Sequence, residues 1–156
     1  MKELIEYREK LLARLHEATV EFCDVCRSFA APFAIADGEW TAHQIAFHVC
    51  GIQREVYGMR VRRTLKEENP EFENFEPEVW MKTHYNRDEA MEKILNEFVK
   101  NMNEVCDLLS AMPQEGWSRL SRHKALGPEL TLQLWAERGL AHLEDHLKAL
   151  KNAQKP

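Results

Sequence analysis

Two histidines near the end of the chain, His142 and His146 in the run AHLEDH, have the spacing of a metal-binding pair. They lie four residues apart in a segment with strong helical periodicity. Because four residues is slightly more than one helical turn, both imidazoles leave the same face of the helix. A helix can in this way offer two nitrogen ligands to one metal ion. The pair therefore predicts part of a metal site, which needs a third ligand from elsewhere.

The third ligand is predicted to be His48, on a different helix. At about 100° of rotation per residue, one apolar stripe of that helix contains Ile45, Val49, Ile52, Val56 and Met59. His48 lies roughly 60° from the centre of the stripe and is expected to face the interior. His43 lies roughly 160° away and is expected to face water. On the last helix His142 and His146 border the apolar stripe, so we expect three imidazoles to converge.

Each of these histidines also has an ordinary structural explanation. A buried histidine is more often hydrogen-bonded within a core than bound to a metal, and histidines near a helix C-terminus are favoured by the helix dipole. Three imidazoles facing one interior are harder to explain in this way, because one metal ion would supply all three with a partner. We predict a divalent-metal site, with zinc or nickel as the ion, formed by His48, His142 and His146. The sequence assigns no catalytic residue.

The number of ligands indicates the chemistry. Three neutral histidines leave at least one coordination position open, which is typical of catalytic rather than structural metal sites. An open position lowers the pKa of a bound water or thiol and so produces a nucleophile near neutral pH. The run HLEDH is not the HExxH of metalloproteases, and Glu144 is expected to point away from the ligand face. The sequence thus favours metal-dependent chemistry on a small molecule.

Four helices are expected to position these residues. Helical periodicity predicts them from about Lys2 to Phe29, from Thr41 to about Lys66, from about Arg87 to Ala111 with Asn86 as the cap, and from Pro128 or Glu129 to about Lys151. No strand-like alternation extends beyond a few residues. The aromatic-rich connection ENPEFENFEPEVWMKTHYN is long enough to let the second and third helices run parallel. We expect it to pack over one end of an all-α four-helix bundle as a lid or rim.

Length and composition limit the functional classes. The chain has 156 residues and a net charge of −5, which favours one domain spanning 1–156 and argues against binding nucleic acid through its phosphates. No segment has the apolar length of a membrane span, and the charged start MKELIEYREK does not resemble a signal peptide. We therefore expect a cytoplasmic protein that acts on a small molecule, with its four cysteines reduced.

Other residues with chemical potential have simpler interpretations. Cys23 and Cys26 have the spacing of a redox or metal motif, but they lie within a helix without a second such pair and are interpreted as packed thiols, as are Cys50 and Cys106. The basic cluster of the second helix could hold a small anion; it comprises Arg60, Arg62, Arg63 and Lys66. Arg63 lies roughly on the azimuth of the apolar stripe and could bind a substrate carboxylate, but it is interpreted in the first place as an arginine on the helix surface.

Three segments together resemble a known family. The second helix reads WTAHQIAFHV, with Trp40 eight residues before His48; the connection contains FENFEPEVW; and the last helix contains LAHLEDHLKAL. These segments resemble the signature, linker and closing helix of the DinB-like superfamily, which includes bacillithiol S-transferases and mycothiol-dependent maleylpyruvate isomerase. The resemblance spans nearly the whole chain.

The resemblance implies a four-helix bundle of up-down-down-up order, with a divalent metal held by three histidines at one end, and a homodimer. Carried over by motif position, the ligands are again His48, His142 and His146. The implied activity is transfer of a low-molecular-weight thiol, as cosubstrate, to an electrophilic small molecule. A metal-dependent hydrolase with the same site and a non-catalytic stress-response or ligand-binding bundle are the alternatives. The sequence departs from many relatives at Gly51, Gln53 and Arg54, where acidic residues are often found.

Overall fold

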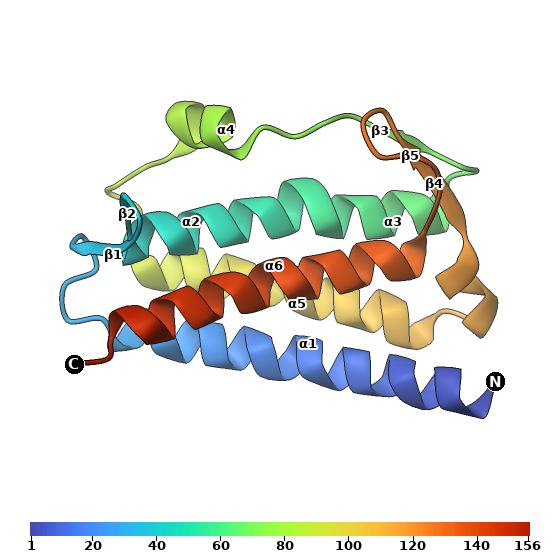
Figure 1. Cartoon of the computed structure of the whole chain (residues 1–156), viewed down its shortest axis with the longest axis horizontal. Coiled ribbons are helices and arrows are strands. Elements are labelled where there is room, and N and C mark those ends of the chain that lie inside the picture. Colours follow the sequence, from blue (N-terminus) through green and yellow to red (C-terminus); the bar gives the residue numbers. More distant parts are fainter.

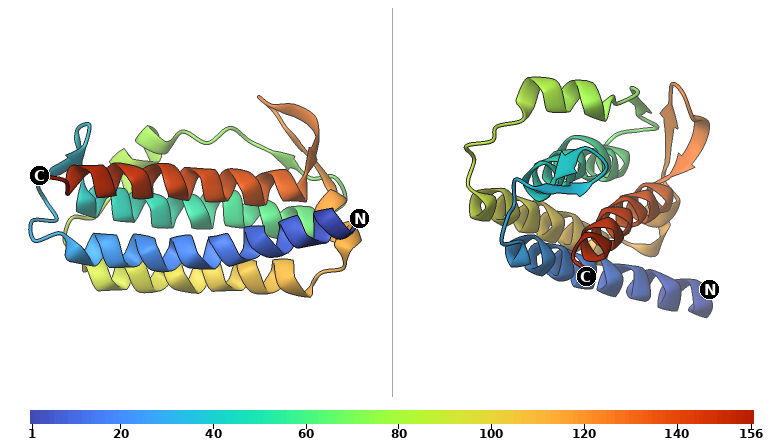
Figure 2. Two further views of the ribbon diagram at one scale, coloured as in Figure 1. Left: turned by 60° about the horizontal axis from the view of Figure 1, so that its bottom comes forward. Right: turned by 60° about the vertical axis from the view of Figure 1, so that its left-hand side comes forward.

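Four long helical segments form the body of the protein (Figure 1), as a computed structural model of residues 1–156 shows. They are α1 (Lys2–Ser28), the continuous run of α2 (Ala42–Ile52), η1 (Gln53–Tyr57) and α3 (Gly58–Lys66), then α5 (Met91–Ala111) and α6 (Leu132–Ala153). Helices α1 and α6 run in one direction and α2–α3 and α5 in the other (Figures 1 and 2). The predicted four-helix bundle of up-down-down-up order is therefore confirmed.

The helices that carry the histidines begin at capped threonines. Thr41 forms a capping box with Gln44: its hydroxyl accepts the Gln44 backbone N–H at 3.1 Å, and the Gln44 side chain accepts the Thr41 backbone N–H at 2.9 Å. Thr131 accepts the backbone N–H of Leu134 at 3.2 Å at the start of α6. Such caps satisfy backbone donors that have no partner within the helix. They fix where each helix starts and hence which way its histidines face.

Two predicted helix starts are wrong. Helix α5 begins at Met91 rather than Arg87, because Asn86 accepts the backbone N–H of Asp88 at 3.0 Å and so stabilises a turn rather than a helix start. Helix α6 begins at Leu132 rather than at Pro128 or Glu129, because the preceding residues form strand β5 (Gly127–Thr131).

Short strands, which the sequence did not predict, occur near both ends of the bundle. Strands β1 (Ile35–Asp37) and β2 (Trp40–Thr41) form an antiparallel pair before α2. Strand β4 (Leu120–His123) pairs in parallel with β3 (Glu71–Phe72) and antiparallel with β5. Strands of this length contain too few residues to produce a recognisable alternation.

The connection between α3 and α5 lies along the outside of α2–α3, not over one end as predicted (Figure 1). It contains β3 and an unpredicted helix, α4 (Pro77–His84). Trp80 of α4 packs against α2 at Gly51, where an added Cβ would come within 2.2 Å of the indole ring. Gly51 thus permits this second layer to approach α2 closely.

The run α2–α3 is interrupted by the π-helical turn η1. A π-helical turn contains about one more residue than an α-helical turn, so residues after it are rotated by roughly 100° relative to an unbroken α-helix. Arg60, just beyond it, is 6% exposed, whereas the Arg63 side chain is 39% exposed and pairs with Glu67. The preferred interpretation of Arg63 as a surface arginine is therefore correct, although its azimuth in a regular helix would have placed it on the apolar stripe.

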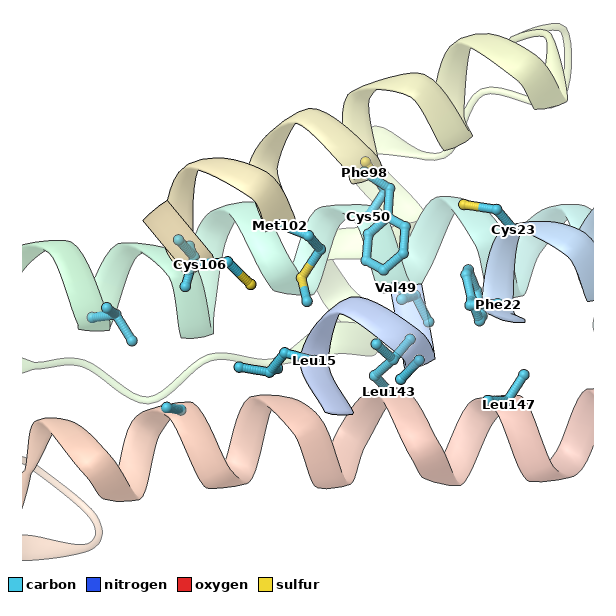
Figure 3. Close-up of a cluster of buried hydrophobic side chains, with 14 of the residues drawn as sticks. Leu15, Phe22, Cys23, Val49, Cys50, Phe98, Met102, Cys106, Leu143 and Leu147 are labelled. Carbon is cyan, nitrogen blue, oxygen red and sulfur yellow. The ribbon is translucent and has the colours of Figure 1, made fainter. Parts of the chain in front are cut away.

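The core between the helices is apolar (Figure 3). It contains four free thiols. Burial raises the pKa of Cys23, Cys50 and Cys106 to about 11 and that of Cys26 to about 12. These thiols stay protonated near neutral pH, which confirms that they are packed core residues. None of the helices combines the length and apolar character needed to span a membrane.

Candidate metal centre

The three histidines singled out by spacing face one another across the contact between α2 and α6. His48 Nε2 lies 3.1 Å from His142 Nε2, which lies 3.2 Å from His146 Nε2. One nitrogen from each ring can be chosen so that all three lie within 4.8 Å of one another. Two nitrogens bound at about 2.05 Å to a tetrahedral zinc ion would be about 3.3 Å apart. The arrangement therefore has nearly the dimensions of a three-histidine metal site.

Hydrogen bonds among the imidazoles cannot satisfy this cluster. Each neutral ring nitrogen offers either one proton or one lone pair, yet Nε2 of His142 faces two other nitrogens at once. In addition, Nδ1 of His48 is buried and has no hydrogen-bond partner. A cation accepting all three lone pairs would resolve the contact, so the donor set fits a divalent metal.

Burial keeps the imidazoles neutral and so suited to bind a metal. It lowers the pKa of His48 and of His142 to about 3, with a smaller contribution from the neighbouring histidines. Burial also lowers the pKa of His146, although the charges of Asp37 and Asp145 oppose this shift. The lone pairs of these rings are consequently free near neutral pH.

Aromatic side chains line the cluster, whereas Gly51 and Arg54 serve packing and ion pairing on the helix surface. The Trp40 ring meets His48 edge-on at 4.7 Å between centroids, and Tyr57 lies 5.8 Å from His142. Gly51 accommodates Trp80, and Arg54 pairs with carboxylates on the helix surface.

Two other histidines are buried outside this cluster, and one of them was expected to face water. His43 does not face water: it is 2% exposed, its Nδ1 lies 2.7 Å from the Tyr85 hydroxyl and its Nε2 lies 2.7 Å from the Glu89 carbonyl. The α3–α5 connection covers that side of α2, a layer that the periodicity of one helix cannot reveal. His123 is also buried, at 4% exposed, between β4 and α3.

A cavity of about 240 Å³ adjoins the histidines. His48 and His142 line one part of it, with Ile52 and Val56 following along α2–η1. Its remaining walls come from Tyr57 and Arg60 farther along the same helical run, the connection leading into α4, the β4–β5 hairpin, and Arg138 on α6. A small molecule in this cavity would lie beside the imidazole cluster.

The comparisons with known proteins agree with this geometry. The family model of the DinB superfamily matches residues 3–150. The chain belongs to the DinB superfamily. Its fold is similar to that of YfiT from Bacillus subtilis, described as a probable metal-dependent hydrolase with an unusual four-helix bundle topology. The two are 18% identical with a TM-score of 0.83, covering 95% of this chain and 86% of YfiT. No curated protein matches the sequence significantly.

Several residues of this DinB superfamily site were not found from sequence alone. Asp37 comes near His146 through the β1–β2 hairpin, and Tyr57 reaches His142 from the π-helical turn. Arg60 and His123 line the cavity although they are far apart in sequence. The sequence signal for Arg60 was its membership of the basic cluster, which the structure divides: Arg62 pairs with Glu104 and Arg63 with Glu67, while Arg60 turns inward.

Proposed function

We propose that this protein is a divalent-metal-dependent enzyme in which His48, His142 and His146 are the ligands. We further propose that it transfers a low-molecular-weight thiol to an electrophilic small molecule. The observation that supports the proposal most directly is the approach of three neutral imidazole nitrogens to one another beside a cavity. The chain's membership of the DinB superfamily supports the proposal independently, as does its structural similarity to YfiT, which is described as a probable metal-dependent hydrolase.

The ligands, the helices that carry them and the surrounding side chains would have different roles in this reaction. A divalent ion held by three neutral histidines would lower the pKa of a thiol or water at its open position. Helices α2 and α6 hold the imidazoles in place, and burial keeps them unprotonated. Trp40 and Tyr57 fix the ring positions from two sides. Ile52 and Val56 give the adjoining cavity an apolar wall that restricts water near the reacting atoms.

A metal-dependent hydrolase with the same three ligands is the second candidate, because YfiT is described as a probable metal-dependent hydrolase. Both reactions use the same site and differ in the nucleophile. In the first, the thiol loses its proton and its sulfur bonds to the electrophilic carbon as the leaving group departs, which is bromide for monobromobimane. In the second, water loses a proton and its oxygen takes the place of the same leaving group. The requirement for a thiol therefore separates the two.

The test has two steps, both on untagged full-length protein. Elemental mass spectrometry of protein reloaded with zinc or nickel should find about one equivalent of metal per chain. The metal-loaded protein is then incubated with monobromobimane, with and without L-cysteine as the thiol, and the products are separated by mass.

Metal-dependent formation of the cysteine–bimane thioether, above the rate without protein, would support thiol transfer. Conversion that needs metal but no thiol would favour the hydrolase. A protein that binds one metal but converts neither this electrophile nor a wider panel would favour a non-catalytic ligand-binding bundle. Failure to bind metal would contradict the whole proposal.

A further inference from the structure

The part of the cavity remote from the histidines contains a buried cation without a counter-ion. Arg60 is 6% exposed, and its Nε is buried without a hydrogen-bond partner. Its guanidinium carbon lies 4.7 Å from the centroid of Trp135 and 5.8 Å from that of Phe72, so aromatic rings hold it in place. Its one oxygen acceptor is the Glu73 carbonyl, 3.3 Å from Nη2. Buried arginines are normally paired with an anion, and this one is not.

His123 adds a second hydrogen-bond donor next to Arg60. Its Nδ1 accepts the backbone N–H groups of Ala125 at 3.0 Å and Leu126 at 3.1 Å. The hydrogen-bond network thus assigns the proton of the neutral ring to Nε2. Nε2 lies 3.3 Å from Arg60 Nη2, so the guanidinium finds another donor there rather than an acceptor. Burial and the charges of Arg60 and Arg138 lower the pKa of His123, which is consistent with the neutral ring, although a hydrogen bond to the Glu73 backbone opposes this shift.

A second arginine, Arg138, lines the same cavity and takes part in no hydrogen bond or ion pair. It precedes His142 by four residues on α6 and so lies on the same face of that helix, one turn away. No aspartate or glutamate lines the cavity. The nearby carboxylates pair elsewhere: Glu73 with Lys124, and Glu137 with Tyr7.

The cavity therefore has a metal-binding part and a positively charged part, with apolar residues between. Trp135, which contacts Arg60, lies seven residues before His142 on α6, roughly 10 Å along the helix axis. Ile52, Val56 and Phe75 contribute the apolar surface of the cavity.

We propose that the substrate is an organic anion whose oxyanion group binds Arg60, His123 and Arg138 while its reactive end lies beside the three histidines. Arg60 and His123 share one backbone acceptor, at Glu73, and Arg138 has none, so donors remain for an acceptor with several lone pairs. A carboxylate or a phosphoryl group provides such an acceptor. The apolar middle of the cavity selects a carbon skeleton over a free inorganic ion. Only the placement of the reactive end rests on the proposed function; the anion site itself does not.

The test measures binding rather than turnover and uses metal-free protein, so that an anion cannot bind through the metal. The probe is 3-phenylpropionate, and its uncharged counterpart is 3-phenylpropanamide. Arginine Nε–H signals are followed by ¹⁵N NMR, with the Arg60 signal assigned from Arg60→Lys, and dissociation constants come from calorimetry. Only the acid should shift the Arg60 signal and bind measurably.

Matched variants locate the site. Arg60→Gln should weaken binding of the acid at least tenfold and Arg138→Gln about threefold, since charge-assisted hydrogen bonds are the strong ones. Arg62→Gln is the control, because Arg62 lies on the same helix but pairs with Glu104 at 3.2 Å outside the cavity. It should leave binding unchanged. If circular dichroism shows that Arg60→Gln is unfolded, the affinity for the acid is measured on Arg60→Lys and Arg138→Gln instead. Lysine keeps the positive charge at position 60 but loses the bidentate geometry of arginine.

Equal binding of acid and amide, or an unchanged affinity in the folded Arg60 and Arg138 variants, would overturn the proposal even if the protein binds metal as proposed. Inorganic phosphate binding more tightly than 3-phenylpropionate would also overturn it, since the site would then serve a free oxyanion. Acid binding that depends on Arg60 in a protein that never takes up metal would support the anion site and contradict the proposed function.

Discussion

The bundle has two interiors that share the same helices but differ in chemistry. On the side of α1 and α5, α2 buries Val49 and Cys50, and α6 buries Leu143 and Leu147 (Figure 3). Where α2 and α6 face each other, they present the histidine cluster. The polar atoms of the first interior are thiols, which burial keeps protonated. The polar atoms of the second are imidazoles and a guanidinium with too few partners.

The unsatisfied polar atoms are confined to one helical run. The three buried side-chain atoms without a hydrogen-bond partner are His48 Nδ1, Arg60 Nε and Thr64 Oγ1, and all of them lie on α2–α3. Leaving a buried polar group unpaired costs about 1–3 kcal/mol. His48 and Arg60 line the cavity, so the proposed metal and anion would give these two side chains partners, whereas Thr64 lies outside the cavity lining. The two interiors thus differ in how completely their polar groups are satisfied.

The largest expected effect is a loss of stability caused by a substitution in the apolar interior. Phe98 is 1% exposed and packs edge-on against Phe22, with 5.3 Å between ring centroids. Phe98→Ala should lower the free energy of unfolding by about 3–5 kcal/mol, through lost burial and the cavity left behind. Metal affinity, measured at a temperature where the variant is folded, should change less than threefold. A matching loss of metal affinity would show that the two interiors are not separable.

A substitution in the histidine cluster should change metal binding. His48→Ala should weaken zinc affinity by at least about 100-fold, because loss of a ligand exceeds the 10–100-fold cost of losing a residue that merely supports one. Competition with a chromophoric chelator measures this affinity. His16→Ala, in an exposed histidine of α1, should bind zinc like the parent. Unchanged affinity in His48→Ala would contradict the three-ligand site.

Acid should destabilise the histidine interior selectively in metal-free protein. The pKa of His48 and of His142 is about 3 when folded and about 6.5 when unfolded, so only the unfolded chain gains these protons as the pH falls below 6.5. Stability should therefore fall from pH 6.5 downward, by up to about 2 kcal/mol for each histidine at pH 5. Urea unfolding at several pH values tests this, and His48→Ala should give a shallower decline. An identical decline would place the pH dependence elsewhere.

The smallest effect is expected at the cap of α2. Thr41→Ala removes the hydroxyl that accepts the Gln44 N–H and should cost about 1 kcal/mol of stability. Zinc affinity should change less than threefold, because packing against α6 still holds His48 in place. Chemical unfolding and the chelator competition report the two quantities separately. A large loss of zinc affinity would mean that the helix start itself sets the ligand geometry.

Sequence periodicity was sufficient wherever one helix faces one partner. The turns of α2 and α6 that carry His48, His142 and His146 obey a regular 3.6-residue repeat, so their convergence could be predicted. It failed where a second layer or an irregular turn intervenes. His43 is buried by a connection whose path depends on Trp80 fitting against Gly51, a contact between distant segments. The inward direction of Arg60 could not be predicted, and Arg63 was placed on the azimuth of the apolar stripe, because nothing in QREVY identifies a π-helical turn from composition alone.

The π-helical turn lets one continuous helix serve both parts of the cavity. In an unbroken α-helix, Arg60 would lie about 120° around the axis from His48; the extra residue reduces this angle to roughly 20°. The direction of the arginine therefore depends on the π-helical turn as well as on the identity of the side chain. A substitution that made this turn regularly α-helical without removing a residue would leave the histidines in place and turn Arg60 about 100° away from the cavity. Loss of one residue together with the π-helical turn would instead leave the arginine at the same angle of roughly 20° from His48. Relatives could therefore differ in length by one residue at this turn while the metal ligands and the cation keep their directions.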